Sequence, residues 1–180
     1  MDILDFAKQA AEEGGKAALS YFNKEHTYHH KGHLSNFATE GDLASEKVIY
    51  DIVRKNFPRD NFLSEEMGLV DNSGEYTWVV DPIDGTVAFS RRLPLWGIAI
   101  SLFKGDEPIL GVINFPVFKE MYWCEKNKGA FLNNKKINVN TVSDLQKSLV
   151  ALEYSYADNR PKQKFPFDAF LRNFPGMVSY

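Results

Sequence analysis

Residues 78–89 read WVVDPIDGTVAF, an apolar run that ends in two carboxylates, Asp81 and Asp84. An unpaired carboxylate is costly to bury, so two at the end of a hydrophobic segment indicate either a bound cation or a solvated turn. The intervening proline stiffens the backbone, and Gly85 allows positive φ and close approach of a ligand. A helix beginning near Thr86 would add free N–H groups beside the carboxylates, which favours a bound anion.

The composition is that of a globular, weakly acidic chain. It has 180 residues, of which 44% are hydrophobic, and a formal net charge of -3, so we expect one substantial core and no basic surface for nucleic acid. The single cysteine, Cys124, cannot form an internal disulfide, and the first residues, MDILDFAKQA, are not typical of a secretory signal. No apolar run approaches the roughly 18 residues of a membrane helix. We therefore expect a cytoplasmic protein that binds neither nucleic acid nor membrane.

Hydrophobic periodicity predicts an α+β fold. Apolar residues recur at helical spacing in residues 3–22 and again in 43–57, where Pro58 ends the second helix. Short strand-like runs follow, and turn residues link them as antiparallel neighbours. These runs are 61–66, 76–81, 97–103, 109–115, 120–125, 130–134 and 136–140. The two N-terminal helices are expected to pack on one face of this mainly antiparallel meander sheet.

The pattern changes beyond residue 147. SLVALEY (148–154) is strand-like, FPFDAFLRNF (165–174) is helix-like, and GMVSY (176–180) opens another apolar strand. We expect a metal-binding α+β domain over residues 1–147 and the beginning of a second α/β domain, incomplete in this chain, over residues 148–180.

Acidic residues gather at the ends of the expected elements. Asp42 opens the second helix, where it is a good N-cap, and Glu65 and Glu66 end the first strand, as Asp81 and Asp84 end the second. A set of oxygen ligands without a companion cysteine suits Mg²⁺ or Mn²⁺ better than Zn²⁺. Ordinary turn residues would explain DPIDGT taken alone. A metal site beside an anion site instead indicates phosphate chemistry.

Three ordered motifs carry a family resemblance. TEGD (39–42), SEEMG (64–68) and DPIDGT (81–86) resemble the inositol monophosphatase family of magnesium-dependent, lithium-sensitive phosphatases, and WCEKNKGAFLNNKKINV (123–139) is also similar. The resemblance covers most of the chain and implies the N-terminal part of the sugar-phosphatase fold. It implies a Mg²⁺-dependent phosphomonoesterase that hydrolyses a small phosphorylated alcohol, such as an inositol monophosphate, with a metal-activated water.

The same resemblance assigns roles to individual residues. It implies that the metal ligands are Glu65, Asp81, Asp84 and the backbone carbonyl of Ile83, that Gly85 and Thr86 contact the phosphate, and that the catalytic residues are Asp42, Glu65 and Thr86. Asp42 and Thr86 would orient the attacking water. Glu66 is expected in the surroundings of the site or in solvent.

Several alternatives stay open. RRLPLWGIAISL (91–102) is also similar to the histidinol phosphatase branch, and sugar and nucleotide phosphatases share the metal motifs. The family's later tryptophan-aspartate motif, whose aspartate completes a metal site, does not occur in the chain, so a non-catalytic metal-binding module is the rival reading and we expect low activity from these residues alone. A homodimer is one candidate assembly.

Other conspicuous residues have structural interpretations. The segment HTYHHKGH (26–33) is interpreted as a solvated loop, with a transition-metal site as the alternative; its histidines are His26, His29, His30 and His33. Lys31 either faces the phosphate, as in the family arrangement, or is a surface lysine. Phe89, Trp96 and Trp123 are expected to pack in the core.

Overall fold

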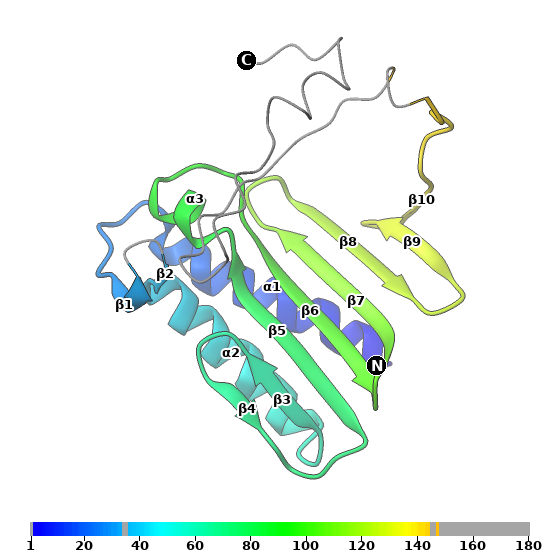
Figure 1. Ribbon diagram of the computed structural model, residues 1–180, viewed down its shortest axis with the longest axis horizontal. Helices are drawn as coiled ribbons and strands as arrows, with labels where there is room; N and C mark the ends of the chain where they lie inside the picture. Colours follow the sequence, from blue (N-terminus) through cyan, green and yellow to red (C-terminus); the bar gives the residue numbers. More distant parts are fainter. Residues whose placement is uncertain (1, 34–35, 145–146, 148–180) are drawn as a thin grey trace, which may run out of the picture. The chain divides into compact units, whose positions relative to one another are not determined.

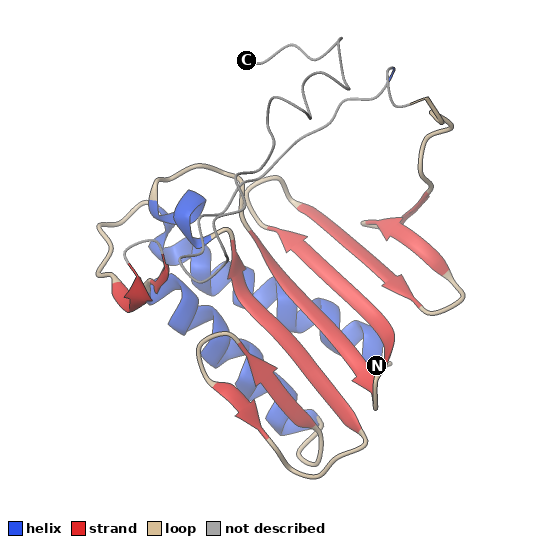
Figure 2. Cartoon of the chain, viewed as in Figure 1, coloured by secondary structure: helices blue, strands red, loops and turns tan. Residues whose placement is uncertain are grey.

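The computed structural model describes residues 2–33, 36–144 and 147, and Figure 2 shows their secondary structure. One compact unit spans Met1–Ile137, and the chain from Asn138 onward belongs to a second unit. The strand, helix and strand expected over residues 148–180 lie outside the described residues. The second α/β domain and its boundary at residue 147 therefore stay predictions.

Two long helices cover one face of the sheet, as the sequence predicted (Figure 1). α1 (Ile3–Phe22) begins at a capping box formed by Asp2, and α2 (Glu40–Asn56) begins at Thr39. The helices approach closely at Gly14, where a Cβ would lie 2.7 Å from Cδ1 of Ile49. Among the described helices, none is both long and apolar enough to cross a membrane.

The sheet of this unit has eight strands in the order β10-β9-β8-β7-β6-β5-β3-β4. The strands are β3 (Asn61–Ser64), β4 (Gly68–Val70), β5 (Tyr76–Asp84), β6 (Gly97–Lys104), β7 (Glu107–Phe115), β8 (Glu120–Glu125), β9 (Gly129–Leu132) and β10 (Lys135–Ile137). From β5 to β10 the strands form the predicted antiparallel meander. β3 and β5 are parallel, contrary to the prediction, because the unpredicted β4 takes the outer edge and the chain returns on the other side of β3.

β5 contains a bulge near its end. Asp81 and Asp84 pair with residues of β6 that are only two positions apart, so β5 has one extra residue between these pairs. The two residues between them, Pro82 and Ile83, are both buried, which breaks the alternation of buried and exposed positions along the strand. A bulge is also where a central strand tolerates a proline, because proline has no N–H for the ladder.

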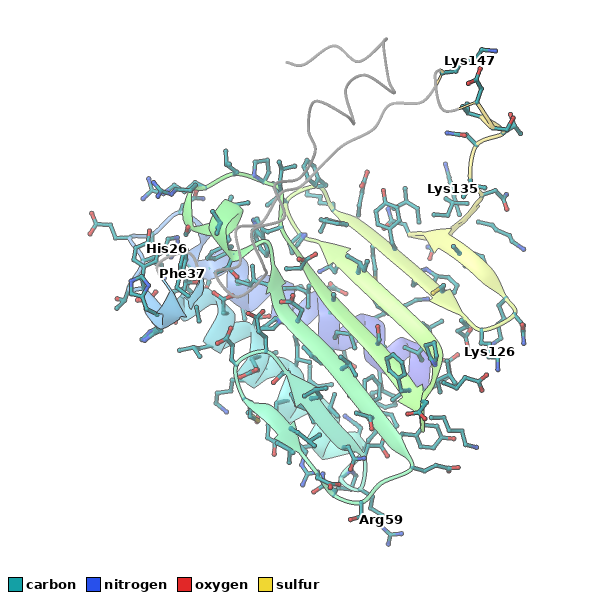
Figure 3. All side chains as sticks on the ribbon, viewed as in Figure 1. His26, Phe37, Arg59, Lys126, Lys135 and Lys147 are labelled. Carbon is teal, nitrogen blue, oxygen red and sulfur yellow. The ribbon has the colours of Figure 1, made fainter. Side chains whose placement is uncertain are left out.

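The histidine-rich segment is not the solvated loop that we expected. β1 (His29–His33) and β2 (Asn36–Ala38) form a separate two-stranded hairpin. Aromatic rings pack on it: the ring centroid of Phe37 lies 4.9 Å from that of Tyr28 and 6.0 Å from that of His30. Figure 3 labels Phe37 at this hairpin. The side chains of Lys31 and His33 lie outside those that the structure describes, so the role of Lys31 stays a prediction.

The core lies between the helices and the sheet. Phe89 and Trp96 are fully buried and pack edge to face with ring centroids 4.9 Å apart, as predicted. Trp123 is only partly buried, but it packs against this core, in agreement with the prediction. Its ring stacks on Phe131 at a centroid distance of 4.0 Å, and the ammonium of Lys8 lies 3.5 Å from the ring centroid.

Candidate metal and phosphate site

The predicted carboxylates follow two parallel strands that lie next to each other. Ser64, the last residue of β3, pairs with Val80 of β5. Glu65 and Asp81 are the next residues along each chain segment, so both emerge at the same edge of the sheet. Asp84 ends β5, and the short helix α3 (Thr86–Ser90) follows directly. The fold therefore brings the SEEMG and DPIDGT motifs together, although residues 69–80 separate them in the sequence.

The N-terminus of α2 adds Asp42 to this edge. The side chain of Asp42 is buried, and its Oδ2 accepts hydrogen bonds from the backbone N of Thr39 at 2.7 Å and from its Oγ1 at 2.6 Å. Thr39 is thus the N-cap and Asp42 the third residue of a capping box, so the prediction of Asp42 as N-cap is wrong.

Thr86 connects the two helices through the other oxygen of Asp42. Its Oγ1 lies 3.1 Å from Oδ1 of Asp42 and also 3.1 Å from the carbonyl oxygen of Ile83. A hydroxyl has one proton, so it donates to one of these acceptors at a time, or to both in a bifurcated bond. The structure thus brings together Asp42 and Thr86, the two residues predicted to orient a water.

Gly85 turns the chain from β5 into α3. Its φ is +96°, and a Cβ at this position would lie 2.8 Å from the carbonyl oxygen of Leu95. Both the backbone conformation and the lack of space require glycine here. The structure thus confirms that the chain adopts positive φ at Gly85 and that a helix begins at Thr86.

Neighbouring carboxylates and burial make ionisation of Asp81 more costly. Burial, together with the nearby charges of Glu65 and Asp84, raises the pKa of Asp81 to about 7. Burial also raises the pKa of Asp42, although hydrogen bonds from Thr39 and Thr86 act in the opposite direction. Oδ1 of Asp81 accepts a hydrogen bond from the backbone N of Ile83 at 3.1 Å. The site therefore concentrates negative charge, and a bound cation would neutralise it.

The oxygen donors of the site suit a hard divalent cation, although the carboxylate side chains do not converge on a single position. Within residues 2–33, 36–144 and 147, no three histidine, cysteine, aspartate or glutamate side chains are gathered closely enough to hold an ion. Glu65 and Asp84 are exposed and Asp81 is partly buried. The donors at this edge of the sheet are carboxylate and carbonyl oxygens, which are the ligands that Mg²⁺ and Mn²⁺ prefer.

Sequence reasoning missed two residues of α2 that contact this site. Oγ of Ser45 donates to the carbonyl oxygen of Pro82 at 2.9 Å, and Oε1 of Glu46 accepts hydrogen bonds from the backbone N atoms of Glu66 and Met67. Both side chains are buried. In the sequence they are polar residues on the same helical stripe as the apolar core residues of α2, which places them on the buried face but does not identify their partners.

Comparisons with known proteins show which family the chain resembles. A model of the inositol monophosphatase family matches residues 1–178. The chain is 36% identical over 138 residues to the fructose-1,6-bisphosphatase/inositol-1-monophosphatase of Aquifex aeolicus, covering 76% of this chain and 52% of that protein. It is 32% identical over 173 residues to the histidinol-phosphatase of Chlorobaculum parvum, covering 93% of this chain and 67% of that protein.

A solved structure has a similar fold. The IMPase of Thermotoga maritima has a TM-score of 0.76 and 31% identity, covering 81% of this chain and 57% of that one. The chain spans about half the length of the first curated relatives that it matches: the matched regions cover 52% and 58% of those two proteins. The family model and these relatives together show that the chain belongs to the inositol monophosphatase family.

Proposed function

We propose that this chain forms the metal-binding part of a Mg²⁺-dependent phosphomonoesterase that acts on a small phosphorylated alcohol. The observation that carries the proposal is the hydrogen bond of 3.1 Å between Thr86 and Asp42, which lies beside the crowded carboxylate of Asp81. The buried carboxylate of Asp42 fixes the hydroxyl of Thr86 next to carboxylates that favour a bound cation. A hydroxyl fixed in this way can orient a water toward a phosphate.

The metal ligands that we propose are the side chains of Glu65, Asp81 and Asp84 and the carbonyl oxygen of Ile83. Mg²⁺ is the proposed ion and Mn²⁺ the alternative, because all the donors are oxygens. When bound, such an ion neutralises phosphate charge and lowers the pKa of a coordinated water.

The chain's own residues would then place the reactants. With its proton directed to Asp42, the hydroxyl of Thr86 has lone pairs left to accept a hydrogen bond from a water. Gly85 carries no side chain, so phosphate oxygens could approach the first backbone N–H groups of α3. We propose Asp42, Glu65 and Thr86 as the catalytic residues and Gly85 and Thr86 as the phosphate contacts.

The substrate is proposed from the relatives. Proteins named inositol monophosphatase and fructose-1,6-bisphosphatase/inositol-1-monophosphatase support an inositol monophosphate or a similar sugar phosphate. The histidinol-phosphatase relative supports histidinol phosphate as the alternative. A non-catalytic metal-binding module is the rival from another class. We propose the cytoplasm as the compartment, since the one cysteine forms no disulfide, and a homodimer as one assembly to be tested.

Metal binding and phosphate release measured together test the proposal. Calorimetry with Mg²⁺ is paired with release of phosphate from inositol monophosphate, histidinol phosphate, fructose 1,6-bisphosphate and a nucleoside monophosphate. Asp84→Asn is expected to abolish both signals, whereas Asp106→Asn, an exposed aspartate in the β6–β7 turn, should change neither. A parent chain that binds no Mg²⁺ contradicts the proposal; one that binds Mg²⁺ but hydrolyses no ester supports the non-catalytic module.

A further inference from the structure

We propose that Glu46 and Ser45 are positioning residues that fix the separation between the two carboxylate-bearing segments of the site. One segment follows β3 and carries Glu65, and the other is the end of β5, which carries Asp81 and Asp84. The proposal rests on the proposed metal-binding function and adds to it the residues that set the geometry of the ligands.

The two residues share one face of α2 with Asp42. Positions 42, 45 and 46 are separated by three and four residues, which places them on the same side of a helix. Their exposed fractions are 1%, 0% and 5%, so this anchoring face, defined as Asp42, Ser45 and Glu46, is buried although all three side chains are polar. Buried polar groups are retained where they make hydrogen bonds, and each of these three bonds a different part of the site.

Glu46 holds the segment after β3. Its Oε1 accepts hydrogen bonds from the backbone N of Glu66 at 3.2 Å and from the backbone N of Met67 at 3.0 Å. Bonds to a carboxylate are stronger than those between neutral groups. Two successive N–H groups bound to one oxygen fix the peptide that directly follows Glu65, and this limits the directions in which the side chain of Glu65 can extend.

Ser45 holds the bulge of β5. Its Oγ donates to the carbonyl oxygen of Pro82 at 2.9 Å, inside the segment where β5 and β6 are out of register. α1 closes on the hydroxyl from the other side, since a Cβ at Gly14 would lie 3.0 Å from this Oγ. The hydroxyl is therefore confined between α1 and the bulge, and the bulge is tied to α2.

One turn of α2 thus bonds both segments through adjacent residues. Consecutive residues of a helix differ in height by about 1.5 Å, so the attachment points cannot drift apart while the helix is intact. The pairing of β3 with β5 ends at Ser64 and Val80, so beyond it these hydrogen bonds to α2 hold the two segments that carry the carboxylates. Loss of a residue that orients metal ligands typically lowers metal affinity by about 10- to 100-fold.

The test uses three variants of the full chain. Glu46→Ala removes the oxygen that accepts the hydrogen bonds from the backbone N atoms of Glu66 and Met67. Glu46→Gln keeps an oxygen that can accept these bonds but removes the charge. Asp51→Ala is the matched control, because Asp51 is an exposed carboxylate on the same helix that pairs with Lys47 at 2.7 Å. Three quantities are measured: hydrogen exchange of the Met67 amide in chelator, the dissociation constant for Mg²⁺, and the melting temperature in chelator.

Glu46→Ala is expected to accelerate exchange at Met67 and to weaken Mg²⁺ binding by about 10-fold or more, beyond what its melting temperature predicts. Glu46→Gln should restore both quantities toward the parent, and Asp51→Ala should leave them unchanged. Unaltered Mg²⁺ affinity in folded Glu46→Ala would overturn the proposal, as would Glu46→Gln behaving like Glu46→Ala. If the parent itself binds no Mg²⁺, the proposed function fails; slow exchange at Met67 that is lost only in Glu46→Ala would still establish the anchor.

Discussion

Replacing Asp81 with asparagine is expected to stabilise the chain when divalent cations are absent. Burial and the charges of Glu65 and Asp84 raise the pKa of Asp81 to about 7 in the folded chain, whereas an unfolded aspartate has a pKa of about 4. The folded chain therefore binds this proton more tightly, and the free energy of unfolding falls as pH rises from about 4 to about 7. Asparagine has no charge to form, and its amide oxygen can still accept the hydrogen bond from Ile83.

The magnitude follows from the difference between the two pKa values. A difference of about 3 corresponds to a ceiling of about 4 kcal/mol. Asp81 is only partly buried, so solvent and salt screen the repulsion, and we expect about 1–2 kcal/mol at pH 8. For a unit of this size, that gain raises the melting temperature by about 3–8 °C.

The assay is thermal unfolding of the parent and of Asp81→Asn in chelator at pH 5 and pH 8. The advantage of the variant should be largest at pH 8 and clearly smaller at pH 5, where the parent carboxyl is protonated. Adding Mg²⁺ at pH 8 should reverse the order, because the parent gains binding free energy and the variant does not. A variant that is less stable than the parent at pH 8 in chelator, or equally favoured at both pH values, would refute the reasoning.

Three further outcomes are expected. Thr86→Val should lower kcat of an active preparation by about 100-fold while leaving Mg²⁺ affinity near the parental value, since the lost hydroxyl bonds to Asp42 and is the group proposed to orient the water; equal losses in both would assign Thr86 to the metal. Gly41→Ala should destabilise the chain by about 1–3 kcal/mol in urea unfolding, because the new Cβ would lie 2.6 Å from Cζ of the buried Phe89; an unchanged midpoint would contradict this packing. The parental melting temperature should climb with Mg²⁺ concentration and stay flat in Asp84→Asn.

The sequence predicted the elements whose pattern is long and regular. α1, α2 and the strands from β5 to β9 have clear helical or strand-like periodicity, and the structure confirms them. β1 and β2 were missed because their residues are mostly polar and the hairpin is packed by aromatic rings from neighbouring positions. β4 was missed because three residues are too few to show alternation. Without β4, the parallel pairing of β3 with β5 could not be foreseen.

The site, like the fold, was predicted only in part from the sequence. The positions of Gly85 and Thr86 followed from local turn and helix chemistry, and the structure agrees with both. The capping role of Asp42 was misplaced, since Thr39 and Asp42 both suit an N-terminus and only the tertiary contacts of α2 decide where it begins. Glu46 was missed because its partners are backbone N–H groups about 20 residues away, at Glu66 and Met67, and a backbone partner leaves no mark in the sequence.

The bulge at Pro82 has a consequence for which residues can be inserted or deleted. In a regular strand, positions separated by an odd number of residues point to opposite faces, so Asp81 and Asp84, three apart, would diverge. The extra residue in β5 corrects this parity and lets both carboxylates leave the sheet on the same side, while Pro82 and Ile83 both remain buried. Deleting either of these two residues would restore regular pairing with β6 and remove the bulge, and with it one of the two adjacent buried side chains and the local backbone whose Pro82 carbonyl Ser45 bonds. Chain length between the two aspartates is therefore as strict a requirement as their identity.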